Sequence, residues 1–345
     1  MVPLVASRFG AALAVLAGAA VASENATAET ARRLATGRLS AGNGARTSVF
    51  GGGRKSHWPA VARLQDAVRT DAHGKMRLAP EFADASDGQA RWLARSVFAH
   101  TSLKQKPGVF VEFGARDGFY ESNTLLYERS FGWTGVLLDA GRDYIHSLRS
   151  GRNCRASDIG GACVWAALDD EAGKRVFWSV FDTTSNRPVL DGYKEQTYQA
   201  TAKDRAVKTL TLQHVLDRFH LGHVDYLSVD CEGCEAKALK TLNLTKTKVD
   251  VISVEFTPCE TAMQLVQEGY VLLPLRFRYD QIFIHARVAS QIPAPDLFLD
   301  SADEQLDLRG FQHAEKLSRT CPGVEDAIWW DGEWPPKRLE RFADQ

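Results

Sequence analysis

The sequence has almost no net charge, because 42 Lys and Arg residues face 43 Asp and Glu residues along its 345 positions. This balance excludes the global positive field by which many proteins hold nucleic acid through its phosphates. The charges are nevertheless uneven, since residues 1–58 contain seven Lys and Arg but two Asp and Glu. We therefore expect a basic head, a mildly acidic body and no nucleic-acid partner.

The apolar run near the N-terminus is too short for a comfortable membrane span of about 20 residues. It covers residues 9–22, follows Arg8 and ends in a small-x-small sequence typical of signal-peptide cleavage. We therefore predict a signal peptide or signal anchor at residues 1–22 and a place in the secretory pathway, in the ER or Golgi lumen or outside the cell. The alternative is an organelle transit peptide, because the sequence from there to Arg54 is rich in arginine and poor in acids. A membrane partner is expected only if the segment stays uncleaved.

Cysteine is scarce, and its six residues are too few for a scaffold built on disulfides. Cys154 and Cys163 flank a loop of Gly, Ser and Asp, so they either pair in an oxidising compartment or remain free thiols. Cys231 and Cys234 form a C-x-x-C, but no second pair or histidine cluster supplies the remaining ligands of a zinc site. The cysteines therefore predict no zinc and leave the redox compartment open.

An apolar content of 44% and a charged content of 25% exclude disorder throughout the chain. Residues 23–80 are predicted to be a flexible basic linker, because Gly, Ser and Arg dominate residues 41–55. From residue 81, short apolar runs alternate with amphipathic segments of helical length, which is typical of parallel strands joined by crossover helices. We predict an α/β domain over residues 81–289 and a C-terminal extension, residues 290–345, packed on it.

The apolar runs predict the order of elements within this domain. The final two strands are expected to be antiparallel, since the segment between them is too short for a helical crossover. The expected strands are 109–113, 135–139, 164–168, 175–180, 224–229, 249–255, 270–275 and 281–286, and the expected helices are 87–103, 212–219, 235–242 and 261–268.

A glycine-bracketed loop follows the first of these strands. Gly114 and Gly118 carry no side chain and tolerate positive φ, so a ligand can approach the backbone there. The loop differs from the dinucleotide pattern G-x-G-x-x-G, since Arg116 stands where that pattern has glycine. A pyrophosphate cradle, and with it a nicotinamide-dependent oxidoreductase, is therefore disfavoured.

Four predicted strands lead directly into a carboxylate: Glu112, Asp139, Asp230 and Glu255. Open α/β sheets bind ligands at the carboxyl ends of their strands, so we expect these acids to converge on one crevice. The first acid suits a cationic group and the second suits ribose hydroxyls, which together fit an aminoacyl-ribonucleoside such as S-adenosylmethionine. The alternative is an ordinary strand-turn-helix with incidental acids.

These features resemble the FkbM family of S-adenosylmethionine-dependent methyltransferases over roughly residues 107–285. The resemblance implies a Rossmann-like class I methyltransferase fold, in which helices cover both faces of a mixed, mostly parallel seven-stranded sheet with an antiparallel last strand. One departure is Asp139-Ala140, where the family more often has Glu followed by Pro. The motifs that carry the resemblance are Glu112-Phe-Gly-Ala-Arg-Asp-Gly118, Ser122-Asn-Thr124 with Leu125 and Glu128, Gly132-Trp-Thr-Gly-Val-Leu-Leu-Asp139 and Asp230-Cys-Glu-Gly-Cys-Glu235.

The resemblance also implies which residues surround the cofactor. The loop after the first strand would hold the methionine part, Asn123 and Thr124 would support that loop, and Asp139 would hold the ribose. The strand end near Ala167 looks like the adenine side. The full set of expected S-adenosylmethionine contacts is Glu112, Gly114, Ala115, Asp117, Gly118, Asn123, Thr124, Asp139, Ala167 and Asp230.

Methyl transfer from a sulfonium is an in-line displacement, so the protein mainly aligns donor and acceptor. A hydroxyl acceptor also needs a base, for which Asp230, Glu232, Glu255 and His285 are the candidates by position. We predict O-methylation, ahead of N-methylation, of a small molecule or a glycan. The alternative function is a catalytically inactive trafficking or interaction module with the same fold. No stable metal is expected, although Asp230 with Glu232 offers two oxygen ligands.

Overall fold

The structure, a computed structural model, describes residues 62–70, 76–78, 88–152, 154, 162–178, 205–294, 309–324, 327, 328, 334 and 342. The chain divides into two units, Met1–Ser56 and His57–Gln345, and every described residue belongs to the second. The expected signal peptide or anchor and most of the expected linker lie outside the described residues. Within the part that is described, no helix is long and apolar enough to cross a lipid bilayer.

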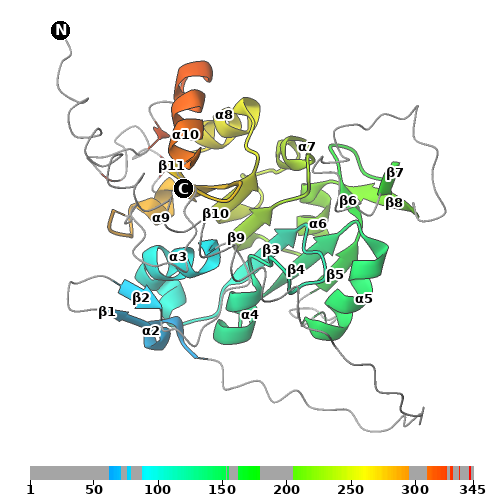
Figure 1. The fold of residues 1–345 in the computed structure, drawn as a ribbon, viewed down its shortest axis with the longest axis horizontal. Helices are drawn as coiled ribbons and strands as arrows, with labels where there is room; N and C mark the ends of the chain where they lie inside the picture. The colour runs from blue at the N-terminus through cyan, green and yellow to red at the C-terminus, as the bar shows by residue number, and fades with distance from the viewer. Residues whose placement is uncertain are drawn as a thin grey trace, which may run out of the picture. The chain divides into compact units, whose positions relative to one another are not determined.

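A mixed sheet of seven strands forms the centre of the domain, in the order β11-β12-β10-β9-β3-β4-β5 (Figure 1). The five strands from β10 to β5 run parallel, and β12 runs antiparallel to both of its neighbours. This topology confirms the predicted Rossmann-like α/β fold with an antiparallel last strand. The strands are β3 (Val109–Phe113), β4 (Thr134–Asp139), β5 (Ala162–Trp165), β9 (His223–Val229), β10 (Lys248–Glu255), β11 (Tyr270–Phe277) and β12 (Asp280–His285).

The central strands are apolar along most of their length because both faces of the sheet are covered. In β9, the side chains of Val224, Tyr226, Leu227 and Val229 are all fully buried. Parallel neighbours joined by crossovers point their carboxyl ends to the same edge of the sheet. The residues that follow β3, β4, β9 and β10 therefore share one edge, which we call the carboxyl edge.

Helices flank the sheet, and local sequence signals set their ends. α6 (Leu212–Arg218) begins where the Thr211 hydroxyl accepts a hydrogen bond from the amide of His214. α4 (Leu125–Phe131) ends at Gly132, whose φ of 69° is a left-handed conformation that favours glycine. The other helices next to the strands are α3 (Gln89–Ser96), α5 (Arg142–Gly151), α7 (Glu235–Lys240) and α8 (Cys259–Gln267), with 3-10 turns η1 (Phe98–His100) and η2 (Ser102–Lys104).

Two smaller sheets accompany the large one. One has three strands, in the order β6 (Ala167–Leu168), β8 (Arg205–Leu210) and β7 (Arg175–Trp178), and the other is the hairpin of β1 (Val68–Thr70) and β2 (Met76–Leu78). The predicted single strand 164–168 is wrong, because the chain leaves the large sheet after Trp165 and pairs with β8 from Ala167. The sequence patterns do not predict β8 itself.

The predicted linker extends too far toward the domain. The short helix α2 (Leu64–Ala67) buries Leu64 and Ala67 to 1% exposure within the hydrophobic core. The amide of Ala62 donates to the carbonyl of Ser130 at 2.9 Å, just before the end of α4. Residues from Ala62 onward therefore belong to the folded domain and are not linker, so the predicted start at residue 81 is corrected.

The C-terminal segment packs against β11 at one end of the large sheet (Figure 1). After α9 (Ala286–Ala289), helix α10 (Arg309–Thr320) contacts β11 and buries Ala314 and Leu317. Further along, Ile328 forms a parallel bridge with Leu272, and the indole nitrogen of Trp334 donates to the carbonyl of Ala289 at 2.9 Å. These contacts join the described part of the extension to the core.

All six cysteines lie in described positions, and all are paired in disulfides. The bonds join Cys154 to Cys163, Cys231 to Cys234 and Cys259 to Cys321, with Cα–Cα distances of 5.2, 5.5 and 5.6 Å. For Cys154 and Cys163 the sequence allows either a disulfide or two free thiols, and the structure has the disulfide. The C-x-x-C residues Cys231 and Cys234 also form a disulfide rather than part of a zinc site. The third bond connects the start of α8 to the end of α10, so it ties the C-terminal helix to the domain.

Opening the Cys259–Cys321 disulfide with two Cys→Ala substitutions should destabilise the domain more than opening Cys154–Cys163 in the same way. The sequence separations are 62 and 9 residues, and the chain-entropy model of loop closure gives a difference of about 2 kcal/mol in the free energy of unfolding. Urea unfolding of both variants beside the unmodified protein measures it. Equal losses would mean that the longer cross-link does not restrain the unfolded chain.

Candidate functional site

The loop after β3 packs directly on the end of β9. Gly114 has a φ of 75°, and the amides of Gly114 and Ala115 both donate to the carbonyl of Leu138, at 3.0 and 3.2 Å. A Cβ atom at Gly114 would lie 1.5 Å from the carbonyl oxygen of Asp230. Glycine is therefore required at this position both for its backbone conformation and for the space that it leaves.

The carboxylate of Glu112 is buried beneath this loop, at 2% exposure. It accepts hydrogen bonds from the Ser122 hydroxyl at 3.0 Å, from the Asn123 amide at 2.7 Å and from the Thr124 hydroxyl. These bonds use most of its acceptor capacity within the protein. The Glu112 side chain therefore positions the loop, and its direct contact with the cofactor stays a prediction.

Arg152 completes that network and was not among the expected site residues. Its guanidinium is buried and donates to the carbonyl of Gly118 at 2.7 Å, to the Ser122 hydroxyl at 2.9 Å and to the Thr124 hydroxyl at 3.0 Å. The nearest oxygen of Glu112 lies 3.9 Å away. Arg152 follows α5, a helix that the sequence patterns do not predict, so no local signal assigned it to the loop.

Asn123 and Thr124 support the loop from below, as expected. The Asn123 side-chain amide donates to the Ser228 hydroxyl at 2.9 Å and to Asp280 Oδ2 at 3.4 Å, and Thr124 is completely buried. Asn123 thus links the segment after β3 to β9 and β12. Neither side chain is exposed enough to be a principal ligand contact.

Asp139 lies at the end of β4 and holds two loops together. Its Oδ2 accepts from the Arg116 amide at 2.7 Å, and its Oδ1 accepts from the Gly141 amide at 2.6 Å. Burial raises the pKa of Asp139 to about 6, against the opposing effect of the two amide hydrogen bonds. The Ala166 amide donates to the Asp139 carbonyl at 3.1 Å, so the segment that leads to Ala167 lies beside it.

The turn between Gly114 and Gly118 closes on Asp117. One oxygen of this carboxylate accepts hydrogen bonds from the amides of Phe119 and Tyr120, both at 2.9 Å. The other oxygen has no hydrogen-bond partner among the described residues. Asp117 is partly exposed, so it is the loop acid that remains able to accept a further hydrogen bond.

Four carboxylates meet beside this loop, and we call them the acidic centre: Asp230, Glu232, Glu255 and Asp280. Asp230 follows β9, Glu255 ends β10, and Asp280 begins β12 directly opposite Glu255 in the antiparallel register. One oxygen from each of Asp230, Glu232 and Glu255 lies within 4.8 Å of the others. The structure therefore brings together three of the four expected catalytic candidates.

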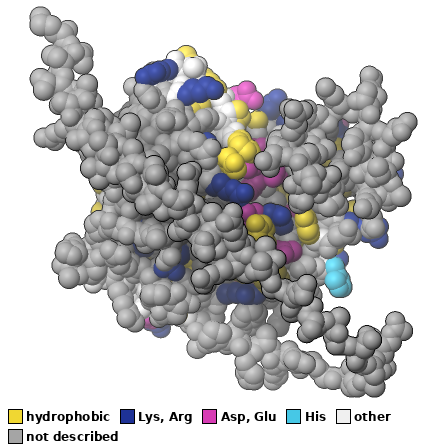
Figure 2. Space-filling view, viewed as in Figure 1, with side chains coloured by type: hydrophobic (Ala, Val, Ile, Leu, Met, Phe, Trp, Pro, Cys, Tyr) yellow, Lys and Arg dark blue, Asp and Glu magenta, His cyan; other side chains and the backbone are white. Residues whose placement is uncertain are grey.

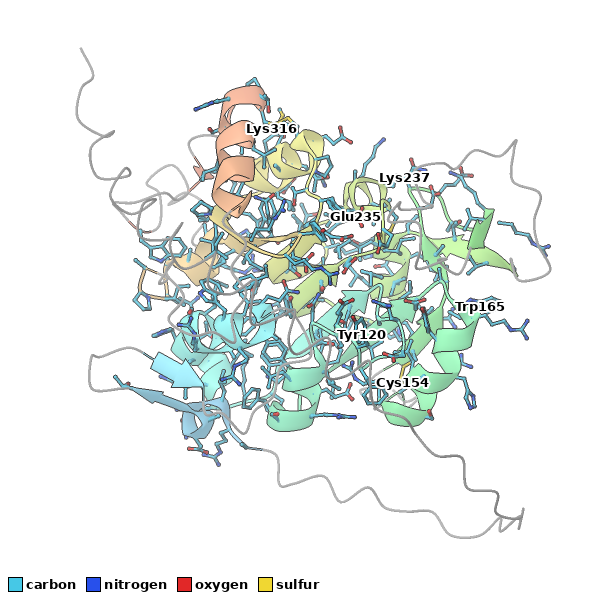
Figure 3. The ribbon with its side chains drawn as sticks, viewed as in Figure 1. Tyr120, Cys154, Trp165, Glu235, Lys237 and Lys316 are labelled. Atoms are coloured by element: carbon cyan, nitrogen blue, oxygen red, sulfur yellow. A yellow bond between two sulfur atoms is a disulfide. The ribbon has the colours of Figure 1, made fainter. Side chains whose placement is uncertain are left out.

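The acidic centre raises the proton affinity of its own members. Burial and the neighbouring carboxylates raise the pKa of Asp230 and of Glu255 well above the usual range. Each of these carboxyl groups therefore binds a proton more readily than an isolated one. Glu235, labelled in Figure 3, is different, since one of its oxygens accepts hydrogen bonds from the amides of Cys231 and Gly233.

His285 does not lie in the site, which corrects the expectation from sequence. It ends β12, and because β12 is antiparallel its final residue lies at the edge opposite the carboxyl edge, paired with Tyr270. There its Nδ1 accepts from the Arg287 amide and caps α9. Burial and the nearby Arg287 charge lower the pKa of His285 to about 4, so it is neutral at physiological pH.

Asp280 is the residue that the antiparallel direction brings to the carboxyl edge instead. It is buried, and its Oδ2 also accepts a hydrogen bond from the side-chain amide of Gln89 in α3, at 2.8 Å. Asp280 could have been identified from the sequence, because the last strand is expected to be antiparallel and Asp280 lies at its start. The first residue of such a strand lies beside the last residues of its parallel neighbours.

The rim around the acidic centre combines arginines, aromatic rings and strained backbone. Glu121 accepts from Arg116 at 2.6 Å and forms an ion pair with Arg278. Phe256 is 46% exposed and stacks on Tyr279 with ring centroids 4.7 Å apart. Figure 2 shows acidic, basic and apolar side chains mixed over the middle of the visible face, and Figure 3 places Tyr120 near the middle of the same view.

Most of the non-glycine residues with positive φ belong to this rim or to the acidic centre. Such conformations cost about 1–3 kcal/mol each and concentrate at functional sites. The positive-φ residues at the carboxyl edge are Arg116, Glu121, Glu232, Phe256 and Arg278.

A separate cavity, lined by Asp170, Glu171, Lys174, Lys240 and Thr241, contains none of the expected site residues.

Comparison with known families identifies the domain. The family profile described as "Methyltransferase FkbM domain" matches residues 112–282. The chain contains a methyltransferase FkbM domain. Its matched segment starts at Glu112 and ends within β12, so it includes the glycine loop, Asp139 and the whole acidic centre, while α2, α3 and α10 lie outside it.

Two solved structures resemble parts of the chain. The first is a methyltransferase FkbM from Methylobacillus flagellatus KT, with 12% identity and a TM-score of 0.35; the match covers 52% of this chain and 44% of that one. The second is the N-terminal domain of human METTL16 in complex with SAH, with 11% identity, a TM-score of 0.26 and coverage of 64% and 90%. The chain thus spans less than half of the first structure. No curated protein matches the chain.

Replacing Gly114 with alanine should destabilise the FkbM domain much more than replacing Gly173. The two glycines have φ values of 75° and 88°, so alanine costs about 1–2 kcal/mol from backbone strain at either position. A Cβ at Gly173 meets nothing within 4 Å, whereas at Gly114 it meets the Asp230 carbonyl. We expect an additional loss of about 2 kcal/mol or more for Gly114→Ala in urea unfolding. Equal losses would show that the loop and the end of β9 are not in close contact.

Proposed function

We propose that the FkbM domain transfers a methyl group from S-adenosylmethionine to a hydroxyl of a small molecule or glycan. The observation that carries this proposal is the contact between the glycine loop and the acidic centre. Gly114, where the donor would lie, touches the backbone of Asp230, and one side-chain oxygen of Asp230 lies within 4.8 Å of oxygens of Glu232 and Glu255. A donor cradle and a candidate base are thus adjacent.

The residues present fit the cofactor. Asp139 ends β4 and has acceptor capacity beyond its two amide bonds. Asp117 keeps a free carboxylate oxygen for an ammonium group. In this proposal Asp117 binds the amino group, Asp139 binds the ribose hydroxyls and the segment at Ala167 borders the adenine. When bound, S-adenosylmethionine supplies an electrophilic methyl group on a sulfonium sulfur.

The acidic centre would prepare the acceptor. In this proposal the Asp230–Glu255 pair accepts the proton that the acceptor hydroxyl loses when its oxygen is methylated. Alignment of this oxygen with the donor supplies much of the rate enhancement. The exposed aromatic ring of Phe256 and the arginines of the rim offer contacts for a sugar or another polar ring.

We place the protein in the secretory pathway. The pairing of all six cysteines supports an oxidising compartment, because such bonds persist outside the cytosol and are rare within it. The signal peptide or anchor at residues 1–22 remains a prediction, as does the alternative transit peptide. In this compartment the partner would be a small-molecule or glycan acceptor, without nucleic acid, and a membrane would be a partner only if the N-terminal segment stays uncleaved.

Calorimetric titration of the full disulfide-bonded chain with S-adenosylhomocysteine tests the donor site without knowledge of the acceptor. We expect saturable binding that Asp139→Asn weakens about tenfold, a loss of about 1.4 kcal/mol. His285→Asn is the matched control, because that side chain lies at the opposite edge and asparagine can also cap α9. Absent binding by folded protein would favour the interaction module, and equal effects of the two substitutions would refute the site assignment.

The same titration should depend on pH through Asp139. Its pKa is raised to about 6 in the folded protein, so the carboxylate that accepts ribose hydroxyls is lost as the pH falls below that value. We expect affinity for S-adenosylhomocysteine to fall about tenfold between pH 7 and pH 5. The Asp139→Asn protein should lack this dependence. The same pH dependence in both proteins would mean that another group controls binding.

A further inference from the structure

We propose that Asp230, Glu232 and Glu255 bind a divalent cation with oxygen ligands, and that Ca²⁺ fits the site as it stands. The three residues come from the end of β9, the loop after it and the end of β10, and one oxygen of each lies within 4.8 Å of the others. The sequence shows the first two as near neighbours, but the third reaches the site through the parallel pairing of β10 with β9. A pair of acids thereby becomes a set of three.

Glu255 provides an independent reason to expect a ligand. The side chain is 6% exposed, and no hydrogen-bond partner in the described part of the chain reaches its Oε2. A buried carboxylate oxygen without a partner costs about 1–3 kcal/mol or more, so such atoms are rare unless an ion or water satisfies them. This oxygen belongs to the residue that closes the set of three acids.

The local charges also favour a cation. The strongest electrostatic influences on Asp230 and Glu255 come from other carboxylates, including Asp280 and Glu232. The arginines of the rim, Arg116 and Arg278, influence Glu232 at the outer side of the set. The inner acids thus have two ways to avoid repulsion, which are a shared proton or a bound cation.

A second acidic group shows what a satisfied cluster looks like in the same domain. His223, Asp225 and Asp250 also lie close together, at the opposite edge of the sheet. There Asp250 forms ion pairs with His223 at 3.0 Å and with Arg287 at 2.7 Å, and Asp225 accepts from the Val109 amide at 2.7 Å. Its charges are compensated by the protein, so it needs no ion.

The spacing of the oxygens fits Ca²⁺. Oxygens bound to Ca²⁺ at 2.3–2.6 Å lie at most about 5.2 Å apart. The three oxygens lie within 4.8 Å of one another, so they can reach Ca²⁺ without movement of the chain. Three carboxylates leave several of the 6–8 Ca²⁺ positions for water or for acceptor oxygens. The role of the ion, which rests on the proposed methyl transfer, is to orient acceptor hydroxyls beside the donor.

Thermal unfolding and calorimetry of the chelator-treated full chain, with CaCl₂ alone as the probe, test this site directly. Ca²⁺ at about 100 times its dissociation constant should raise the Tm by about 5 °C. Glu255→Gln should abolish this shift and weaken Ca²⁺ binding at least tenfold, while its Tm without Ca²⁺ should not fall, since the substitution removes repulsion. Glu260→Gln, an exposed acid in the first turn of α8, is the matched control and should behave like the unmodified protein.

Several results would overturn the proposal. If the unmodified chain shows no saturable Ca²⁺ binding, the acids are compensated by protons and not by an ion. If Glu255→Gln binds Ca²⁺ as the unmodified chain does, the ion does not bind at this set of three acids. If Glu255→Gln fails to fold by circular dichroism, Glu232→Gln, at the exposed side of the set, gives the same test. Titration with S-adenosylhomocysteine on the same protein separates the two proposals, because donor binding without Ca²⁺ binding refutes the ion alone, and the reverse refutes the donor site alone.

Discussion

The close approach of Gly114 to the carbonyl of Asp230 is the constraint on which the site depends. β3 and β9 are parallel neighbours, so the loops that follow them leave the sheet side by side, with no room for a Cβ between them. This contact places the glycine loop against the first residue of the acidic centre. The proposed donor cradle and the proposed base are therefore adjacent because of strand order alone, and any change that separates the two loops would disturb both.

The acids of the carboxyl edge fall into two physical classes. Glu112 and Asp139 accept hydrogen bonds from nearby backbone and side-chain groups, and these bonds stabilise the loops that follow β3 and β4. Asp230 and Glu255 lie beside one another and beside Glu232, and Oε2 of Glu255 has no donor among the described residues. Buried carboxylates of the first class stabilise a loop geometry, whereas those of the second class favour protons, cations or hydroxyl donors. Chemistry is expected from the second class.

Much of the fold could be predicted because its signals are local. The buried runs of β3, β9 and β10 are long and apolar, and the short connection between β11 and β12 allows only an antiparallel return. The elements missed are those with weak local patterns: α5, β8 and the early helix α2, whose two buried residues stand in an otherwise polar segment. The split of the predicted strand 164–168 also had no local signal, since both halves are apolar and only pairing partners distinguish them.

Residue order determined which side chains stand at the ends of strands, and so identified Asp139, Asp230 and Glu255 as members of one edge. It could not determine which of the acids are satisfied by the protein itself. The position of Glu112 in the chain predicts a ligand, but the Ser122–Thr124 segment and Arg152, 40 residues away, surround its carboxylate. The direction of β12 likewise decides which of its ends reaches the site. Because β12 is antiparallel, Asp280 at its start lies at the carboxyl edge and His285 at its end lies at the opposite edge. Hydrogen-bond satisfaction and strand direction depend on contacts between distant segments, and these exist only once the chain has folded.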